Sequence, residues 1–351
     1  MKVVTVVGAR PQFIKEAAVA RKLRRVYDEV LVHTGQHYDV NMSDVFFDEL
    51  SIPRPDYNLG ISGSSHGKMT GLMMGAVEEV LLREKPDRLL VYGDTNSTLA
   101  GALAAVKLHI PVCHVESGSR LGTRTNPEEI NRICTHHVSS LLMYCTESAV
   151  PHLKEEGLFD RSVLVGDPMY DAFVHFSQYA GKDRLDAVHA PEKFYYMTFH
   201  REENCSVESA TAVLDAANSL DAPTVYPVHP RNRALVEEIC ERHGFRNVLR
   251  IPPVGYLTSL ALTLGCEKVL TDSGGLQREA FFAEKQCVLL FNYVCWPETM
   301  VDNRNQLAKC DKADILAKLS APMKVDRSYQ PFGDGDAASK IIAAMEHVTL
   351  K

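Results

Sequence analysis

The sequence predicts an α/β protein made of two doubly wound domains, each with a parallel sheet covered by helices on both faces. Short runs rich in Val, Leu and Ile alternate with segments of helical periodicity along the chain. Within these runs apolar and polar residues do not alternate, as expected for strands buried on both faces of a parallel sheet. A length of 351 residues exceeds the usual size of one hydrophobic core, so two domains are expected.

Ten of these runs are predicted as strands, and the spaces between them are long enough for helices. In order along the chain they are 3–7, 29–33, 88–92, 111–115, 141–146, 194–199, 224–228, 248–251, 269–271 and 288–291. The segment Met69 to Leu82 has apolar residues at helical spacing, and Lys85-Pro86-Asp87 is predicted to end that helix.

The domain boundary is predicted within 172–190, where the apolar pattern loosens before a new βα series begins at Phe194. We therefore expect an N-terminal domain over 1–175 and a C-terminal domain over 185–330. A final helix within 331–351 could belong to either half, and it could pack back on the N-terminal domain. Doubly wound sheets bind ligands at the carboxyl ends of their strands, so we expect the two domains to face a shared cleft.

Composition excludes several classes of function. A net charge of −7 gives no general attraction for nucleic acid, and no apolar stretch approaches the length of a membrane span. The chain enters its first strand directly, without a signal-like segment, so we expect a cytoplasmic protein. The nine cysteines show no metal-ligand spacing, and most lie in apolar stretches. Buried, reduced thiols are therefore expected rather than disulfides or a metal site.

The most informative tract is Thr271 to Ala280, in which a buried strand runs through a Ser-Gly-Gly turn into a helix. Gly274 and Gly275 remove side chains from the turn, so backbone N–H groups can approach an anion at the positive end of the helix. Asp272 or Ser273 can cap this helix, and Glu279 can accept hydrogen bonds from sugar hydroxyls. Ser273-Gly274-Gly275 alone would fit an ordinary βα turn equally well.

A second candidate anion site follows the first strand. Gly8 permits a tight turn there, and Pro11 suits the first turn of a helix. Arg10 and Lys15 bring two cations to that helix N-terminus. Two solvated surface cations would explain the same pattern equally well.

Three carboxylates lie at or beside the ends of neighbouring predicted strands in the N-terminal half. They are Asp94, Glu116 and Glu128, and Arg132 follows Glu128 by one helical turn. Taken singly, Asp94 could be a helix cap, and Glu128 with Arg132 could form a surface salt bridge. Together they converge on one edge of the sheet, where like charges raise one another's pKa and provide both an acid and a base.

Two histidines follow strands of the second half in the same way. His200 comes after the first strand of that half and His229 after the second, each with an arginine close by. A lone histidine is more often structural than functional. Two at the strand ends of a domain that also carries the Ser-Gly-Gly turn are better explained as ligands of a diphosphate.

These motifs, in this order, resemble the non-hydrolysing UDP-N-acetylglucosamine 2-epimerases. The matching segments run from Lys2 to about Asn305 and include GARPQFIK, TGQHYD, YGDTNSTLAGALAA, HVESGSR, PEEINR, VGDPMYDA, TFHREEN, PVHP and TDSGGLQREA. The resemblance implies two Rossmann-like domains in a glycosyltransferase-B-like arrangement, a UDP-sugar substrate, no cofactor, and a homodimer that supplies precursors of surface polysaccharides or related glycans.

The resemblance also implies a role for each matching position. Asp94, Glu116 and Glu128 would be the acid/base carboxylates, and His200 would help UDP depart. The other matching positions would bind the substrate: Arg10, Lys15, Arg132, His229, Ser273, Gly274, Gly275 and Glu279. In the implied reaction the C2 proton is removed as UDP leaves C1, and UDP returns after re-protonation on the opposite face.

The sequence departs from the commonest members of that family in ways that leave the sugar open. Glu202 and Trp296 stand where those members have arginines, and Ser119 stands where they have leucine. The segment His37 to Met42 lacks the stretch that allosterically activated members use, so we predict no substrate-activated cooperativity. Motifs such as HYDVNMSDVFF resemble a sister group acting on UDP-2,3-diacetamido-2,3-dideoxyglucuronate, for which Arg120, Arg124 and Arg304 are candidate cations.

Other classes of function are weaker matches. A glycosyltransferase would share the fold, but it has less use for several strand-end carboxylates. A hydrolysing epimerase usually begins with a GSRAEY-like motif rather than GARPQF. A nucleotide-sugar sensor could dispense with Asp94, Glu116 or Glu128, and all three are present.

Overall fold

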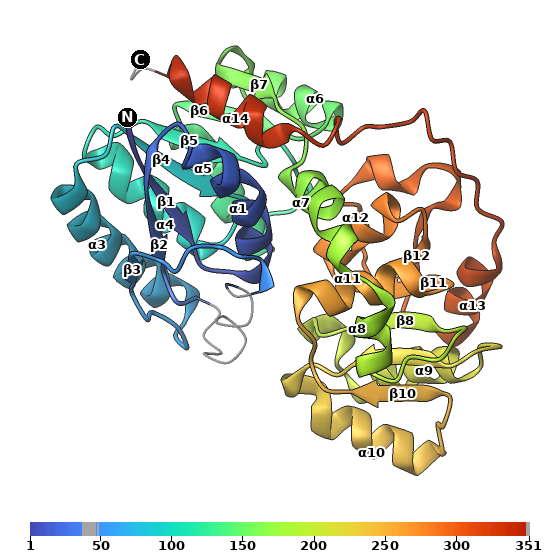
Figure 1. Cartoon of the computed structure of the whole chain (residues 1–351). Helices are drawn as coiled ribbons and strands as arrows, with labels where there is room; N and C mark the ends of the chain where they lie inside the picture. Colours follow the sequence, from blue (N-terminus) through green and yellow to red (C-terminus); the bar gives the residue numbers. More distant parts are fainter. Residues whose placement is uncertain (37–46, 48, 349–351) are drawn as a thin grey trace. The chain divides into compact units, whose positions relative to one another are not determined.

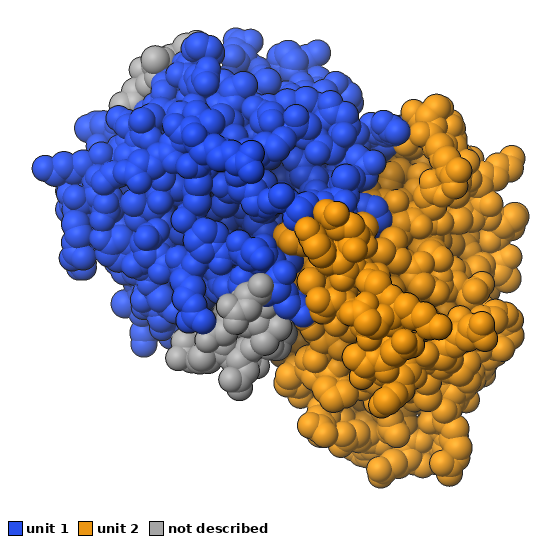
Figure 2. Space-filling view, viewed as in Figure 1, with its two compact units in different colours: residues 1–175, 330–351 blue, residues 176–329 orange. Residues whose placement is uncertain are grey.

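The computed structural model describes residues 1–36, 47 and 49–348. The chain forms two compact units: unit 1 comprises Met1–His175 with Gln330–Lys351, and unit 2 comprises Phe176–Tyr329 (Figure 1, Figure 2). Each unit is built on a parallel sheet with helices around it, so the predicted fold class is confirmed. The segment 37–42, on which the prediction about cooperativity rests, lies outside the described residues.

Among the described residues, the sheet of unit 1 has seven strands in the order β3-β2-β1-β4-β5-β6-β7. The strands are β1 (Lys2–Val7), β2 (Asp28–His33), β3 (Tyr57–Asn58), β4 (Arg88–Tyr92), β5 (Val112–Val115), β6 (Leu141–Tyr144) and β7 (Ser162–Leu164). Strand order reverses between β1 and β4, which is where ligands bind at the carboxyl edge of open α/β sheets.

The helices of unit 1 cover the sheet and connect its strands. They are α1 (Arg10–Leu23), α3 (His66–Glu84), α4 (Asn96–Lys107), α5 (Pro127–Val138), α6 (Val150–Glu155), α7 (Pro168–Phe176) and α14 (Ala337–Glu346), with short turns η1 (Glu147–Ala149) and η2 (Phe159–Arg161). α3 and α4 bury Val77, Leu81 and Ala102 against the strand residues Val4 and Val91. α3 ends at Lys85 in the left-handed conformation, directly before Pro86, as the sequence predicts.

The C-terminal helix α14 packs on α1 and completes unit 1 (Figure 1). Lys22 of α1 contacts Asp336 at 2.5 Å, and Arg88 Nε donates to the carbonyl of Met345 at 2.7 Å. The carboxylate of Asp171 on α7 caps α14, because it accepts the N–H groups of Ala337 and Ala338 at 2.9 and 2.8 Å. The last helix is therefore held by residues from three parts of unit 1.

The sheet of unit 2 has six strands among the described residues, in the order β10-β9-β8-β11-β12-β13. The strands are β8 (Tyr195–Thr198), β9 (Thr224–Pro227), β10 (Val248–Ile251), β11 (Lys268–Thr271), β12 (Gln286–Leu289) and β13 (Asn305–Leu307). The helices are α8 (Lys182–Ala187), α9 (Val207–Asn218), α10 (Arg233–His243), α11 (Tyr256–Gly265), α12 (Gly274–Phe282) and α13 (Lys312–Ser320), with turns η3 (Ser177–Tyr179), η4 (Glu202–Asn204), η5 (Pro230–Asn232) and η6 (Pro297–Asn303).

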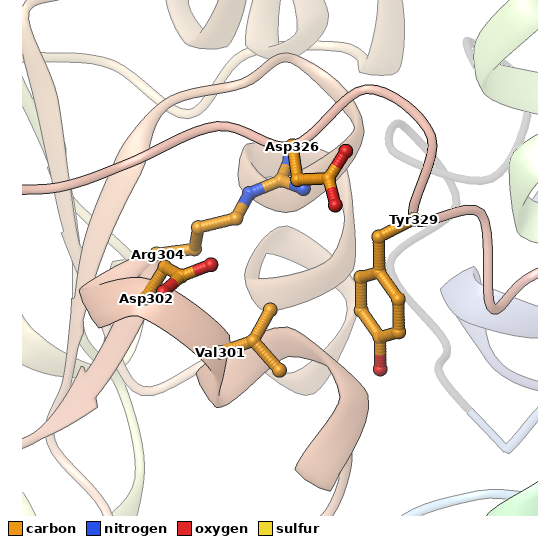
Figure 3. Close-up of a pocket in the computed structure, with 5 residues that line it drawn as sticks. All are labelled: Val301, Asp302, Arg304, Asp326 and Tyr329. Atoms are coloured by element: carbon orange, nitrogen blue, oxygen red, sulfur yellow. The ribbon is translucent and has the colours of Figure 1, made fainter.

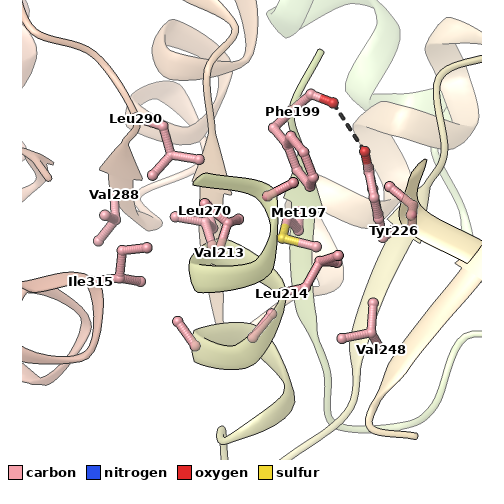
Figure 4. Close-up of a cluster of buried hydrophobic side chains, with 14 of the residues drawn as sticks. Met197, Phe199, Val213, Leu214, Tyr226, Val248, Leu270, Val288, Leu290 and Ile315 are labelled. Atoms are coloured by element: carbon pink, nitrogen blue, oxygen red, sulfur yellow. Dashed lines mark hydrogen bonds between the residues drawn. The ribbon is translucent and has the colours of Figure 1, made fainter. Parts of the chain in front are cut away.

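Adjacent strand residues of unit 2 bury their side chains on opposite faces of the sheet. Met197 and Leu270 pack with α9, α10 and α13 on one face, where Tyr226 donates a hydrogen bond to the carbonyl of Phe199 at 3.0 Å (Figure 4). Tyr196 and Val269 pack with α11 and α12 on the other face. Burial on both faces explains why these strands are continuous apolar runs.

Two sequence predictions differ from the fold. All ten predicted strands are present, but the short strands β3, β7 and β13 were not predicted. The stretch 172–190 is largely helical, because it contains most of α7 together with η3 and α8.

In the parts of the chain that the structure describes, no helix combines the length and apolarity needed to span a membrane. All nine cysteines are free thiols, and those at 113, 145, 266 and 287 are buried as predicted.

Candidate active site

The turn after β4 presents Asp94 at the carboxyl edge of the unit 1 sheet. Gly93 has a φ of 64°, which lets the chain turn sharply there, and Thr95 caps α4 by accepting the N–H of Thr98 at 3.3 Å. The carboxylate of Asp94 contacts the guanidinium of Arg132, which reaches it from α5. Asp94 is therefore the partner of a cation rather than the cap of α4.

Arg132 does not form the salt bridge with Glu128 that their spacing would allow. Its guanidinium contacts Asp94 and also Glu129, whose carboxylate lies 2.5 Å away. Glu128 lies exposed in the first turn of α5, where its N–H donates to the capping side chain of Asn126 at 2.8 Å. Its carboxylate forms no ion pair with any residue that the structure describes, so it is the most accessible of the three predicted carboxylates.

Glu116 follows β5, the neighbour of β4, and its backbone is in the left-handed region with a φ of 65°. A residue other than glycine rarely adopts this conformation, and such strain is concentrated at functional sites. The ammonium group of Lys15 contacts its carboxylate, and the two side chains are 3% and 13% exposed. The predicted substrate cation Lys15 is thus a buried partner of a predicted acid/base carboxylate.

Gln12 organises this edge of the sheet, and it was not predicted as a functional residue. Its buried side chain accepts the N–H groups of Gly8 and Ala9 at 2.8 and 3.0 Å and donates to the carbonyl of Tyr92 at 2.8 Å. It therefore connects the turn after β1 to the end of β4. Gly8 is required by close packing, because a Cβ atom there would lie 2.1 Å from Ser97 Oγ. Arg10, the other predicted cation, is the first residue of α1 and is partly exposed.

His114 on β5 is structural. It is fully buried, and its Nε2 donates to the carbonyl of Gly93 at 2.6 Å. Burial lowers the pKa of His114 to about 4, even though the hydrogen bond to Gly93 opposes this shift. The imidazole is therefore neutral near pH 7.

Two further side chains lie beside Glu116. Cys145 follows β6 and Asp167 follows β7, and the ligand atoms of these two residues and Glu116 all lie within 4.8 Å of one another. A thiol and two carboxylates are ligand types for metals such as zinc. Lys15 already contacts Glu116, however, so the cluster contains its own cation and we assign no metal to it.

In unit 2 the Ser-Gly-Gly turn has the predicted geometry. Ser273 caps α12 by accepting the N–H of Leu276 at 3.4 Å. A Cβ atom added to Gly274 would meet no atom within 4 Å, so the start of α12 is open. Gly275 is similarly uncrowded, because its nearest neighbour would be Ser273 Oγ at 3.8 Å. Glu279 lies within the helix and is only 4% exposed.

His200 and His229 come together beside this turn, because β9, β8 and β11 are neighbours in the sheet. Their rings stack with centroids 5.5 Å apart, and Nδ1 of His200 lies 3.2 Å from Oδ1 of Asp272. The other oxygen of Asp272 accepts the N–H groups of His200 and Arg201, both at 2.8 Å. Burial opposes ionisation of Asp272, but the His200 contact and these hydrogen bonds outweigh it and lower its pKa.

The structure also shows the surroundings of Trp296, one of the departures from the family pattern, and of the candidate sugar-binding cations. Trp296 is buried, and the guanidinium of Arg278 lies 4.3 Å from the centroid of its ring. Arg120 is held by the carboxylate of Glu156 through two contacts of 2.6 Å. The buried side chain of Arg304 donates to the carbonyl of Phe281. Of the three candidate sugar-binding cations, these two are used within the fold and Arg124 is exposed.

A small cavity of about 140 Å³ lies elsewhere in unit 2, lined by Val301, Asp302, Arg304, Asp326 and Tyr329 (Figure 3). Arg304 donates to Phe281 at the C-terminal end of α12, whereas the Ser-Gly-Gly turn is at its N-terminal end. A helix of nine residues is about 13 Å long. We therefore do not assign this cavity to the nucleotide.

Comparisons with known proteins identify the family. The family model of UDP-N-acetylglucosamine 2-epimerase matches residues 21–346. The chain belongs to this family. One member, the UDP-N-acetylglucosamine 2-epimerase homolog of Methanococcus maripaludis, is 44% identical over 99% of this chain and 100% of its own length. Another, the UDP-2,3-diacetamido-2,3-dideoxy-D-glucuronate 2-epimerase of Pseudomonas aeruginosa, is 44% identical over 97% of this chain and 98% of its own.

Solved structures of UDP-N-acetylglucosamine 2-epimerases have the same fold. The Methanocaldococcus jannaschii enzyme in complex with UDP-GlcNAc and UDP has a TM-score of 0.90 and 35% identity, covering 98% of this chain and 99% of that one. The Neisseria meningitidis enzyme bound to UDP-GlcNAc has a TM-score of 0.89 and 28% identity, with coverage of 98% and 99%.

Proposed function

We propose that this protein is a non-hydrolysing 2-epimerase that interconverts UDP-GlcNAc and UDP-ManNAc. The observation that carries the proposal is the pair of carboxylates at the ends of β4 and β5, Asp94 and Glu116, each in contact with a cation of its own. Membership of the family supports epimerase chemistry, and we assign that chemistry to these groups. Exposed Glu128 is the third carboxylate of this edge.

In the proposed reaction one carboxylate removes the proton from C2 of the sugar. The electrons of the C–H bond form a C1–C2 double bond while the C1–O bond breaks and UDP leaves with that electron pair. A 2-acetamidoglucal and UDP result. A second carboxylate then delivers a proton to the opposite face of C2, and UDP adds back to C1. Lys15 and Arg132 would hold Glu116 and Asp94 in place through this cycle.

Unit 2 would bind the leaving UDP. Negative charge that develops on the diphosphate is stabilised by N–H donors at a helix N-terminus, which Gly274 and Gly275 leave open at the start of α12. His200 and His229 would donate to the same diphosphate, and Asp272 would hold His200 in position. Glu279 would accept hydrogen bonds from the nucleotide, and Arg10 would provide a further cation.

A second candidate substrate is UDP-2,3-diacetamido-2,3-dideoxyglucuronate. The chain is 44% identical to the Pseudomonas aeruginosa enzyme named for that sugar but 32% identical to the Escherichia coli UDP-N-acetylglucosamine 2-epimerase. An acidic sugar needs an additional cation, and exposed Arg124 lies two residues before the cap of α5. The chemistry at C1 and C2 would be the same for both sugars.

Proton NMR in deuterium oxide tests the reaction and its substrate together. The enzyme is incubated separately with UDP-GlcNAc and with the diacetamidoglucuronate. A manno-configured UDP-sugar with deuterium at C2 is expected from the true substrate. Product from only one sugar identifies that sugar, and the absence of exchange with both would contradict the proposed function.

We also propose that two copies of the chain associate through α3. Gly67, Gly71 and Gly75 lie one turn apart on this helix, and a Cβ atom added to any of them would meet no atom within 4 Å. Leu72 and Leu82 beside them are 50% and 56% exposed. Such a helix face allows close approach of a second backbone and buries exposed leucine.

The two compact units are proposed to be the two domains of the enzyme, with 331–351 belonging to the first. The proposed location is the cytoplasm, whose reducing conditions maintain free thiols such as the nine found here.

A further inference from the structure

Three neighbouring strands of unit 1 bring ionisable side chains to one point. β5, β6 and β7 are adjacent and parallel, so their carboxyl ends lie at the same edge of the sheet. Glu116 and Cys145 directly follow β5 and β6, and Asp167 follows β7 by three residues. An oxygen of Asp167 lies within 4.8 Å of one of Glu116, although Asp167 is 0% exposed.

Asp167 is fixed in this position by the chain on both sides of it. Its N–H donates to the carbonyl of Phe332 at 2.9 Å, and its Oδ1 accepts the N–H of Met169 at 2.9 Å. Gly166 before it has a φ of 86°, and a Cβ atom there would lie 3.0 Å from the same Phe332 carbonyl. The returning C-terminal segment therefore helps to hold Asp167 beside Glu116.

Two carboxylates held this close cannot both ionise without a cost, and burial increases that cost. Lys15 acts in the opposite direction, because its ammonium favours the ionised form of Glu116. The thiol of Cys145 and the imidazole of His114 also lie near Glu116. Burial keeps His114 neutral, so among these groups Asp167 and Lys15 carry charges of opposite sign.

We propose that Asp167 is a positioning residue that makes Glu116 hold its proton to a higher pH than Lys15 alone would allow. The inference rests on the proposed function, in which a strand-end carboxylate both releases and accepts a proton in the course of turnover. A carboxylate beside a buried lysine alone would stay ionised and would be a poor acid. The negative charge of Asp167 offsets the lysine and brings the proton affinity of Glu116 closer to the working pH.

The test is an NMR titration of protein whose glutamates are labelled at the carboxyl carbon. The Glu116 resonance is identified by its loss in Glu116→Gln. Asp167→Asn keeps the shape of the side chain and removes its charge, and the titration midpoint of Glu116 is expected to fall by about 0.6 to 2.5 pH units. The lower figure is the repulsion of two unit charges about 4.8 Å apart in water, and the higher figure is their repulsion at the effective dielectric constant of a protein site. A titration in two steps in the wild type should become a single step. A midpoint that does not move would overturn the proposal.

Two further variants separate charge from structure. Asp167→Thr is a second uncharged variant that can still accept the Met169 N–H, and it should lower the midpoint as Asp167→Asn does. Asp171→Asn removes a nearby carboxylate that caps α14, and it should leave the Glu116 midpoint unchanged. If the midpoint falls but the pH profile of kcat/KM in Asp167→Asn does not shift with it, then the acid/base role of Glu116 is wrong and the electrostatic inference stands.

Discussion

The ammonium of Lys15 on α1 contacts the carboxylate of Glu116 after β5, and both side chains are largely buried. This contact joins two residues that the sequence assigned to different tasks, one to the nucleotide and one to proton transfer. Because the pair is buried, each charge depends on the other for its solvation. Removing one member should therefore affect stability as well as turnover.

Lys15→Met keeps the aliphatic part of the side chain and removes its charge. We expect the free energy of unfolding to fall by about 3 to 5 kcal/mol, because Glu116 loses its contact with a buried cation while Asp167 remains beside it. Urea unfolding curves measure the change. The control is Lys340→Met, whose partner Asp334 is exposed and which should cost less than about 1 kcal/mol. Equal effects of the two substitutions would contradict the importance of the buried pair.

Asp94→Asn, Glu116→Gln and Glu128→Gln each remove one proposed acid/base group without changing side-chain shape. Turnover should fall by about 10²- to 10⁴-fold in each, while UDP binding measured by calorimetry is retained. Glu155→Gln on the exposed surface of α6 serves as the control and should keep normal turnover. If any of the three variants kept the wild-type rate, the acid/base role assigned to the replaced residue would be wrong.

Glu16 should make the stability of the protein depend on pH. Its carboxylate is fully buried and accepts the hydroxyl of Tyr92 at 2.8 Å. Burial, followed by the charge of Glu29, raises the pKa of Glu16 well above its ordinary value of 4.5. A raised folded-state pKa means that the stabilisation is fully present below pH 4.5 and is lost as the pH rises through the folded-state pKa.

Glu16→Gln resembles the protonated acid and should remove this dependence. Urea unfolding between about pH 5 and 9 should show a smaller loss of stability in Glu16→Gln than in the wild type. The exposed-site variant Glu155→Gln should follow the wild-type curve. If stability fell equally with pH in Glu16→Gln and in the wild type, Glu16 would be ionised in both the folded and the unfolded protein, contrary to this prediction.

Gly274→Val tests the Ser-Gly-Gly turn as the UDP site. The new side chain has space in the folded protein, because no atom lies within 4 Å of the added Cβ. It would cover the N–H groups at the start of α12, so UDP affinity should fall at least about tenfold, or about 1.4 kcal/mol. Gly274→Ala should lose less. Unchanged UDP binding by Gly274→Val would place the nucleotide elsewhere.

Leu72→Asp tests association through α3. A charge in the middle of the exposed glycine and leucine face should convert the proposed dimer to monomer in light scattering after size-exclusion chromatography. Val207→Asp changes an equally exposed apolar residue on α9 and should leave the mass unchanged. A dimer that survives Leu72→Asp would mean that another surface joins the copies.

The interior strands could be predicted from the sequence, and the edge strands could not. Interior strands such as β1, β4 and β11 are buried on both faces, so they appear as continuous apolar runs. β3, β7 and β13 lie at sheet edges and have only two or three residues each, too few to form a pattern. Missing β7 had a consequence, because Asp167 was then not recognised as a strand-end carboxylate.

The partners of the predicted site residues also required the structure. Spacing placed Glu128 and Arg132 on one helix face, but the guanidinium turns to Glu129 and Asp94 instead. Spacing also gave no sign that Lys15 would reach Glu116, which is about a hundred residues away in the chain. Ser273 could be predicted as a cap because its interaction with the start of α12 is local in sequence.

The return of α14 to unit 1 determines the order in which the protein can be completed during synthesis. Unit 2 is continuous from Phe176 to Tyr329, so it can fold as soon as it has left the ribosome. Unit 1 has to wait for the residues after Gln330 that α1 and Asp171 bind. At about 5 to 20 residues per second the wait is on the order of 10 to 30 s. The half of the protein that emerges first is thus the half that is completed last.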